Sequence, residues 1–436
     1  MTALYAQLRL RAGESLELSI RFEPPESLRD AVQQWDPAWG ELAHQLEFTL
    51  AWWAAWERGA GPVPHSDPLT RRSALVLKAR CFERTGAIAA AATTSLPEAP
   101  GGVRNWDYRY SWLRDSVLAV RALHALGFGR EAERFRAFIE RSAAGNARQL
   151  QLMYGLDGRR RLTEFTLDHL EGWRGARPVR IGNAAAQQTQ LDAYGTLLEL
   201  AWLSHDAQRP PDEAYWSFLV DAVNCTCDRW REPDHGIWEV RDAPRHFVHS
   251  KAMCWVAVDR GIRLAQGHGR AAPLDHWRAV RQEIRDDIDA HGYDPALGVY
   301  RQAYGHTQPD ASLLLPHFGY LAYDDSRMRR TTDWIRRELD CGGLLLRYDC
   351  ADGLPDREGT FLACTFWLVE CLARQGRLDE AWRSYRRAVE CANELGLLSE
   401  EVLRDGTGML GNFPQALTHL SQVTARLALD GAQDAG

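Results

Sequence analysis

Apolar and polar residues alternate at the start of the chain, over residues 4–22, with a Gly-containing break near Ala12–Glu14. This pattern predicts two strands joined as a β-hairpin. Asp36 and Pro37 then have the residue types of a helix cap and a first helical position. The helix should run to about Arg58, with a broad apolar face formed by Trp39, Leu42, Leu46, Leu50, Trp53 and Trp56.

From Asp67 onward the hydrophobic pattern is helical, and one unit repeats. An apolar helix ends in a short turn with Gly or Pro, and an amphipathic helix that begins with acidic residues follows. The turns and second helices lie at 126–138, 206–218, 266–280 and 374–385, with a weaker instance at 324–334; the apolar helices lie at 110–126, 185–205, 247–265 and 358–374. Roughly twelve helical segments predict an all-α, double-layered (α/α)6 barrel of six hairpins, with the apolar helices inside.

Six spacers interrupt this helical rhythm, and they are rich in Gly, Arg, Asp and aromatic residues. They span 87–109, 143–182, 231–246, 292–312, 340–357 and 396–411. Each follows an outer helix or precedes an inner one, so a closed barrel would gather them at one end. We therefore expect a functional site at that end.

Composition excludes several classes of protein. The chain has 436 residues and a net charge of −7, which argues against nucleic acid or an anionic membrane as a partner. Its nine cysteines show no metal-binding spacing and are interpreted as reduced thiols. The N-terminus has no apolar signal core, and no run of eighteen apolar residues occurs. These features predict a cytoplasmic protein.

The stretch Arg104–Ser116 combines the side chains that a sugar site needs. Its Trp and Tyr rings offer flat apolar faces, its arginines donate hydrogen bonds and its aspartates accept them. A pyranose has apolar C–H faces and a rim of hydroxyls, so this mixture suits it. The alternative is a helix start with its aromatic residues in the core and its charges on the surface.

Two spacers offer carboxyl groups among apolar neighbours, as glycoside hydrolysis requires. Glu239 lies between Trp238 and Val240, where apolar surroundings would raise its pKa as a general acid needs. Glu400 and Glu401 are adjacent and point opposite ways in an extended segment, so one of them at most should face a site. The alternative for each spacer is a carboxylate that points into solvent.

The central stretch resembles the N-x-D-Y-x-Y-x-W-x-R-D segment of glycoside hydrolase family 15, which contains glucoamylases, glucodextranases and one class of trehalases. The resemblance runs from about Leu69 to about Arg426, and its blocks occur in the family's order. They include 85–98, 150–158, 177–195, 236–255, 309–316, 344–354, 359–372, 397–402 and 410–420.

The resemblance implies roles for individual residues. Glu239 corresponds to the general acid and Glu400 to the general base. Substrate-binding positions match Trp112, Arg114, Asp115, Trp238 and Arg347, and Lys251 lies close enough to the acid to bind substrate or only to cap a helix. The implied function is an inverting, exo-acting α-glucosidase-type hydrolase that releases terminal glucose from a small oligosaccharide or disaccharide and needs no cofactor.

Bacterial members of the family usually carry a complete β-sandwich before the barrel, and this chain resembles only the end of one. We therefore divide it into a β-hairpin remnant (1–28), a linker helix (29–66), a catalytic barrel (67–430) and a tail (431–436). An uncovered Trp-rich face on the linker helix predicts self-association as a homo-oligomer. The alternative function is a non-catalytic carbohydrate-binding or degenerate homologue.

Overall fold

The computed structural model describes residues 7–16, 42–59, 67–143, 146–204, 210–315, 319–355 and 357–433. It divides into two compact units, Met1–Ala60 and Gly61–Gly436. In the first unit, a turn lies at residues 12–13, and helix α2 (Leu42–Arg58) ends at the residue that the pattern predicted. The helix start at Asp36–Pro37 lies outside the described residues, as does most of the predicted hairpin, which stays a prediction.

The second unit is a barrel of two helical layers. Its inner layer contains α4 (Leu113–Ala125), α6 (Asp192–Leu203), α8 (Val248–His268), the short 3-10 helix η5 (Ala311–Leu314), α11 (Leu362–Arg374) and α13 (Ala416–Gln433). Each of these elements packs on the next, and α13 packs on α4. The inner layer is therefore a closed ring.

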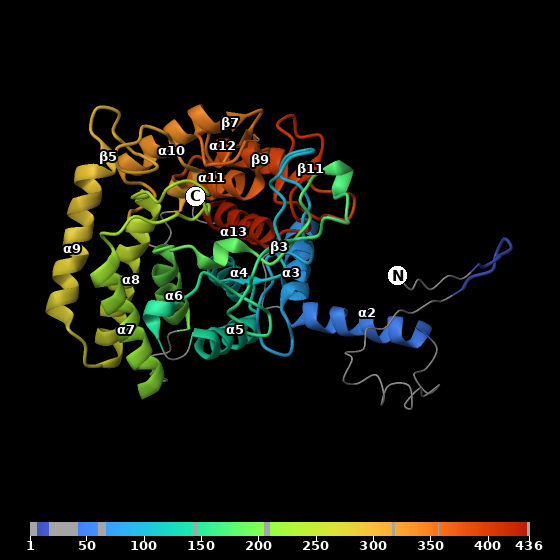
Figure 1. Ribbon diagram of the computed structural model, residues 1–436, viewed down its shortest axis with the longest axis horizontal. Helices are drawn as coiled ribbons and strands as arrows, with labels where there is room; N and C mark the ends of the chain where they lie inside the picture. Colours follow the sequence, from blue (N-terminus) through green and yellow to red (C-terminus); the bar gives the residue numbers. More distant parts are fainter. Residues whose placement is uncertain are drawn as a thin grey trace. The chain divides into compact units, whose positions relative to one another are not determined.

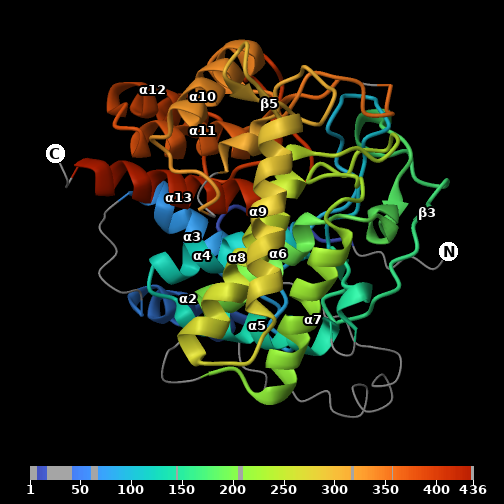
Figure 2. The same cartoon turned by 90° about the vertical axis from the view of Figure 1, so that its left-hand side faces the viewer.

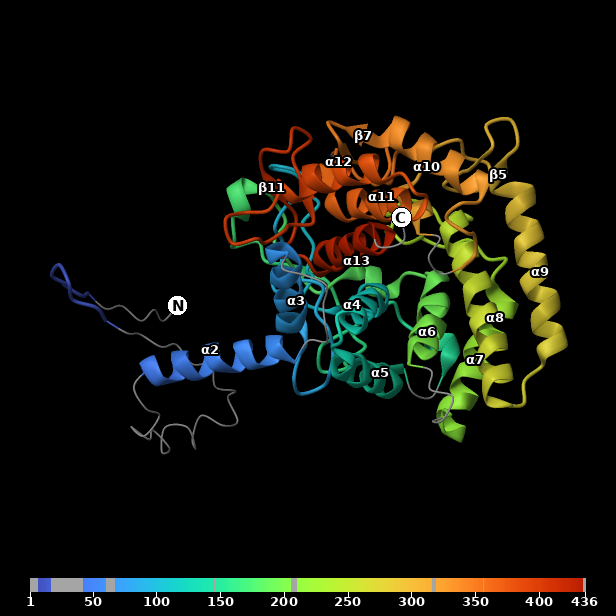
Figure 3. The same cartoon turned by 180° about the vertical axis from the view of Figure 1, so that it is seen from behind.

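The outer helices pack against this ring from outside. They are α3 (Pro68–Arg80), α5 (Gly129–Ala143), α7 (Glu213–Arg229), α9 (Leu274–His291), α10 (Ser326–Leu339) and α12 (Leu378–Val389). Figures 1 and 2 show α9 lying along the outside of α8, and Figure 3 shows α12 outside α11.

The two layers follow from how apolar residues are distributed along each helix. In α11 every residue from Leu362 to Ala373 is buried, as expected for a helix that is covered on all sides. In α12 only Ala381, Tyr385 and Ala388 are buried, at the spacing of one helical face. The predicted helical barrel is confirmed for the described residues. Its sixth inner position is occupied by η5, since the chain at 311–314 forms one tight turn and not a long apolar helix.

The spacers contain short antiparallel ladders and single helical turns. The strands are β1 (Ser111–Trp112), β2 (Met153–Tyr154), β3 (Phe165–Thr166), β4 (Arg180–Ile181), β5 (Tyr293–Asp294), β6 (Val299–Tyr300), β7 (Asp340–Cys341), β8 (Leu344–Leu345), β9 (Thr360–Phe361), β10 (Glu401–Val402) and β11 (Met409–Leu410). The turns are η2 (Ala147–Gln149), η3 (Trp173–Gly175) and η4 (Ala184–Gln187). Strand β10 lies between β9 and β11, so two distant segments, β9 and the β10–β11 hairpin, meet beside Glu400.

All nine cysteines are free thiols, in agreement with the prediction from their spacing. Within the described ranges, none of the helices combines the length and the apolar character needed to cross a membrane.

The close packing of α6 on α8 makes a prediction about stability. A Cβ atom on Gly195 would lie 2.3 Å from the carbonyl oxygen of Met253, whereas one on Gly431, in α13, would meet nothing within 4 Å. We expect Gly195→Ala to destabilise the fold by about 1–3 kcal/mol through overpacking. Gly431→Ala should instead stabilise it by about 0.5–1 kcal/mol, because alanine is the better helix former. Urea unfolding midpoints of the two variants test this, and equal effects would contradict the packing argument.

Candidate active site

A cavity of about 640 Å³, including its open mouth, lies where the spacers meet. Four of the six spacers and the start of α4 supply its lining: Ala90, Glu98, Arg104, Trp106, Tyr108, Trp112, Arg114, Asp115, Ile237, Trp238, Glu239, Val240, Arg241, Arg347, Tyr348, Asp352, Leu354, Phe361 and Glu400, with Gln415 and Leu417 from the start of α13. Glu239 and Glu400, distant in sequence, line one cavity.

The first turn of α4 carries three of the predicted substrate-binding residues. Strand β1 pairs with β2, which fixes Trp112 immediately before the helix. The Trp112 Nε1 donates a hydrogen bond of 2.7 Å to Oε1 of Glu239. Arg114 donates from Nε to Asp115 (2.7 Å) and from Nη1 to the Ile237 carbonyl (2.6 Å). The aromatic stretch is therefore connected directly to the segment that contains the predicted acid.

Glu239 has an unusual backbone conformation. Its φ is +57°, in the left-handed region that costs a non-glycine residue roughly 1–2 kcal/mol. The conformation is held by turns in which the Glu239 amide donates to Gly236 and the Val240 amide to His235. Gly236 also has positive φ, and a Cβ atom there would lie 2.8 Å from the Phe247 ring. The surrounding chain thus holds the Glu239 side chain toward the cavity.

Burial raises the pKa of Glu239, while the charge of Arg114 and the hydrogen bond from Trp112 oppose that shift. Only 18% of its side chain is exposed. A carboxyl group with a raised pKa, open to a cavity on one side, keeps its proton to higher pH than a free glutamate and can donate it to a leaving oxygen.

Glu400 lines the cavity from a position immediately before β10 and beside β9. Its Oε1 accepts a 2.9 Å hydrogen bond from the Tyr108 hydroxyl, and its buried Oε2 has no hydrogen-bond partner among the described residues. Gly411 faces this carboxyl, and a Cβ atom there would lie 2.7 Å from Oε2. One oxygen is therefore held in place, while the other is buried without a hydrogen-bond partner among the described residues.

The neighbouring Glu401 points away from the cavity. Its Oε2 accepts a 2.9 Å hydrogen bond from the Gly359 amide, and the residue belongs to β10. This arrangement agrees with the prediction that one member of the pair at most faces the site.

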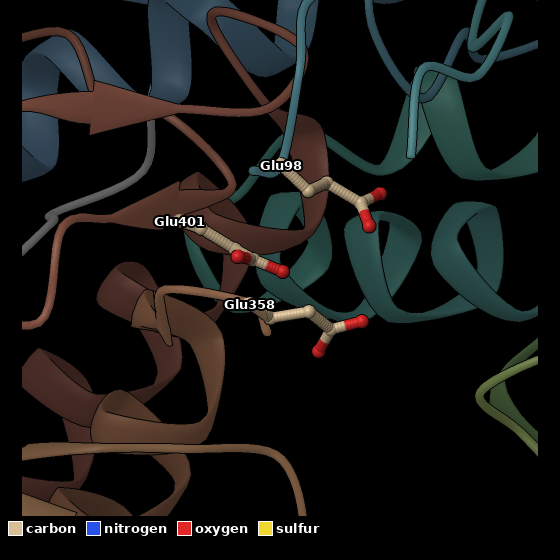
Figure 4. A group of neighbouring side chains, drawn as sticks. All are labelled: Glu98, Glu358 and Glu401. Carbon is tan, nitrogen blue, oxygen red and sulfur yellow. The ribbon is translucent and has the colours of Figure 1, made fainter. Parts of the chain in front are cut away.

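Glu98, Glu358 and Glu401 form a second group of carboxyls behind Glu400, with ligand atoms within 4.8 Å of one another (Figure 4). Such a group could hold a cation. However, Glu358 is already paired with the guanidinium of Arg347 and, at 2.5 Å, with that of Arg104. We therefore interpret the group as part of an ion-pair network in which the arginines supply the positive charge.

The pKa values in this group reflect its excess of carboxyls. Burial raises the pKa of Glu98 to about 7. Burial also raises the pKa of Glu400 well above its usual range, and the charge of Glu98 adds to this shift, whereas Arg347 opposes it. The two groups titrate together, so the pKa of Glu400 depends on whether Glu98 is ionised.

Arg347 and Trp238 also line the cavity, from two spacers that are distant in sequence. The Arg347 Nε donates to Glu358 at 2.7 Å, and its guanidinium lies 5.5 Å from the centre of the Trp238 ring. Trp238 in turn donates from Nε1 to Asp310 at 2.8 Å and stacks on Trp367. Both side chains are fixed before any substrate binds.

Lys251 is the one candidate that does not line the cavity. It is buried, and its ammonium donates to the carbonyl of Trp230 and, at 2.6 Å, to that of Glu232. These carbonyls lie just after the last turn of α7, so the placement favours the helix-capping alternative over substrate binding.

Sequence reasoning did not assign roles to Glu98, Tyr108, Arg241 or Glu358. Tyr108 and Glu98 lie inside segments that carry the family resemblance, so their position in those segments was an available signal. Arg241 is two residues from the predicted acid. Glu358 offered no signal, because its partners Arg104 and Arg347 meet it only in the folded chain.

A sequence profile of the family described as glycosyl hydrolases family 15 matches residues 69–427. The chain is 42% identical over 430 residues to a trehalase from Mycobacterium tuberculosis, covering 96% of this chain and 62% of that protein. It is 38% identical to a trehalase from Thermoplasma acidophilum, covering 89% and 67% respectively. The chain thus spans somewhat under two thirds of the mycobacterial relative's length.

Solved structures share the fold at low identity. A bacterial glucoamylase complexed with acarbose aligns with a TM-score of 0.62 at 15% identity, covering 84% of this chain and 55% of that one. The glucoamylase from Saccharomycopsis fibuligera aligns with a TM-score of 0.62 at 11% identity, covering 84% and 95%. On the match over residues 69–427, this chain belongs to glycosyl hydrolases family 15.

Proposed function

We propose that this chain is an inverting, exo-acting hydrolase of α-glucosides, with trehalose as its substrate. The observation that carries the proposal is that two carboxyls, the partly buried Glu239 and the buried Glu400, line one cavity together with an Arg114–Asp115 pair and Arg347. Two carboxyls that flank a glycosidic bond are the minimum machinery for its hydrolysis.

Glu239 acts as the general acid in this proposal. Its carboxyl protonates the glycosidic oxygen, and the departing sugar carries that proton away as its hydroxyl. Burial favours the protonated form before the reaction, and the nearby Arg114 stabilises the carboxylate that remains. The hydrogen bond from Trp112 orients the group throughout.

Glu400 acts as the general base. Its carboxylate takes a proton from a water molecule that attacks the anomeric carbon from the opposite face, while Tyr108 holds Oε1. Inversion requires room for this water, so we expect the two carboxyls to be about 6.5–9.5 Å apart. The base must be ionised for this step, and the charge of Arg347 favours that state against burial and the charge of Glu98.

The choice of trehalose rests on the trehalases among the relatives. Maltose and isomaltose present the same terminal glucose, so the first-ring residues do not discriminate among them. A cytoplasmic location is part of the proposal and is supported by nine free thiols, a state that reducing compartments maintain. Self-association through α2 also remains a prediction.

Replacing either carboxyl by its amide tests the assignment. Glu239→Gln and Glu400→Gln should each lower kcat by about 10²–10⁴, because each removes one proton transfer. Glucose release from trehalose and from maltose measures the effect. Glu394→Gln, at an exposed loop carboxyl, is the matched control and should leave activity unchanged. Full activity in either site variant would refute its role, and no glucose from wild type would favour a binding-only homologue.

Inversion makes a distinct prediction for trehalose. The glucose that is attacked should appear as the β anomer, while the departing glucose keeps its α configuration. Proton NMR in the first minutes should therefore show α and β glucose in equal amounts, before mutarotation. Two α anomers would instead indicate a retaining mechanism.

Removing the charge of Glu98 should change the pH dependence of kcat/KM. Its negative charge raises the pKa of Glu400, so Glu98→Gln should lower that pKa. Glu400 would then be ionised at lower pH, and the acidic limb of the kcat/KM profile should move to lower pH. A limb that stays in place or moves upward would show that the two groups are not linked as proposed.

A further inference from the structure

Four arginines line the cavity, and three of them are neutralised by carboxyl groups. Arg104 pairs with Asp352 at 2.7 Å, Arg114 with Asp115 at 2.7 Å, and Arg347 with Glu358. Arg241 differs from them: among the described residues, its guanidinium has neither an ion pair nor a hydrogen bond.

The position of Arg241 is nevertheless fixed by its backbone. Its amide donates a 3.0 Å hydrogen bond to the Asp352 carbonyl. Gly353, on the same loop, packs so closely that a Cβ atom there would lie 2.9 Å from the Arg241 carbonyl carbon. Leu354, the next residue, also lines the cavity. The guanidinium is thus presented from a well-anchored chain.

The Arg241 guanidinium is held over an aromatic ring. Its Cζ lies 4.5 Å from the centre of the Trp106 ring, and the Cζ of Arg180 lies 4.7 Å from the same centre. Arg180 is outside the cavity lining and is tied to the Val103 and Asn105 carbonyls at 2.9 Å each. Stacking of this kind orients a guanidinium while leaving its N–H groups free to donate.

We propose that Arg241, supported by Trp106, binds the hydroxyls of the second sugar ring, the one that leaves. This inference rests on the proposed function and adds the residue that selects a disaccharide. Arg241 is two residues from Glu239, and the departing ring must lie beside the acid that protonates it. The Arg114–Asp115 pair and Arg347 belong to the side that holds the first ring, so the unpaired donors are available to the second.

Binding without turnover tests this assignment. In the Glu400→Gln background, the Kd of trehalose and of methyl α-glucoside, which has no second ring, would be measured by calorimetry. Adding Arg241→Ala should weaken trehalose binding by about 10- to 100-fold, as expected for lost hydrogen bonds from a charged donor. Methyl α-glucoside binding should change by less than about threefold. Arg241→Lys, which keeps the charge but not the planar fork, should fall between these effects.

Arg245→Ala is the matched control. Arg245 lies on the same spacer but pairs with Asp242 at 2.7 Å and does not line the cavity, so both affinities should persist. Equal weakening of both ligands by Arg241→Ala, or unchanged trehalose binding, would overturn the inference. Failure of the proposed function is a different result, in which wild type releases no glucose from trehalose. Unfolding midpoints identify any variant that has lost its fold. If Arg241→Ala is such a variant, the affinities of Arg241→Lys for the two ligands decide the question.

Discussion

The shortage of positive charge among the carboxyls in and beside the cavity is the constraint on which the rest of the site depends. Glu98, Glu358, Glu400 and Glu401, all buried or nearly so, share two guanidiniums, those of Arg104 and Arg347, with Asp352. Isolated buried carboxylates are too costly to keep ionised, so some of these groups must hold protons. A barrel end that was only structural would be more stable with apolar residues of similar volume. Retaining this group makes sense if one of its carboxyls must accept a proton.

The same reasoning explains the backbone strain at Glu239 and the close packing beside the two carboxyls. Glu239 has a left-handed backbone, and Gly236 and Gly411 leave no room for a Cβ atom beside their neighbours. Local strain and close approach at two separate carboxyls are the marks of a pre-organised site, because neither improves packing. The inner helices provide the rigidity that maintains both features. In α11, which leads away from β9, twelve successive residues are buried.

The sequence was informative where a single segment determines its own structure. The apolar run at 358–374 and the charged face at 374–385 predicted α11 and α12, because burial on all sides and burial on one face leave different periodicities. The sixth inner position could not be predicted in this way, since η5 is held by a cap from Asp310 and by packing on α8 and α11. The partners of Glu358 and Lys251 could not be predicted for the same reason. Their partners are contributed by distant segments, so only the folded chain reveals whether a charge meets a substrate, an arginine or a helix end.

The architecture also separates what is constant in the site from what can vary. Trp112, Arg114 and Asp115 belong to the junction of β1 with α4, and α4 packs on both α13 and α6 within the ring. A change there would disturb the barrel as well as the proposed site for the first sugar ring. Trp106 and Arg241 lie in spacers, which tolerate substitution with little effect on the helices. Members of one fold could therefore keep the machinery for terminal glucose while altering the residues that meet the second ring. On this view, an unpaired arginine at the cavity is a specificity device: its donors acquire partners only when the correct leaving sugar is bound.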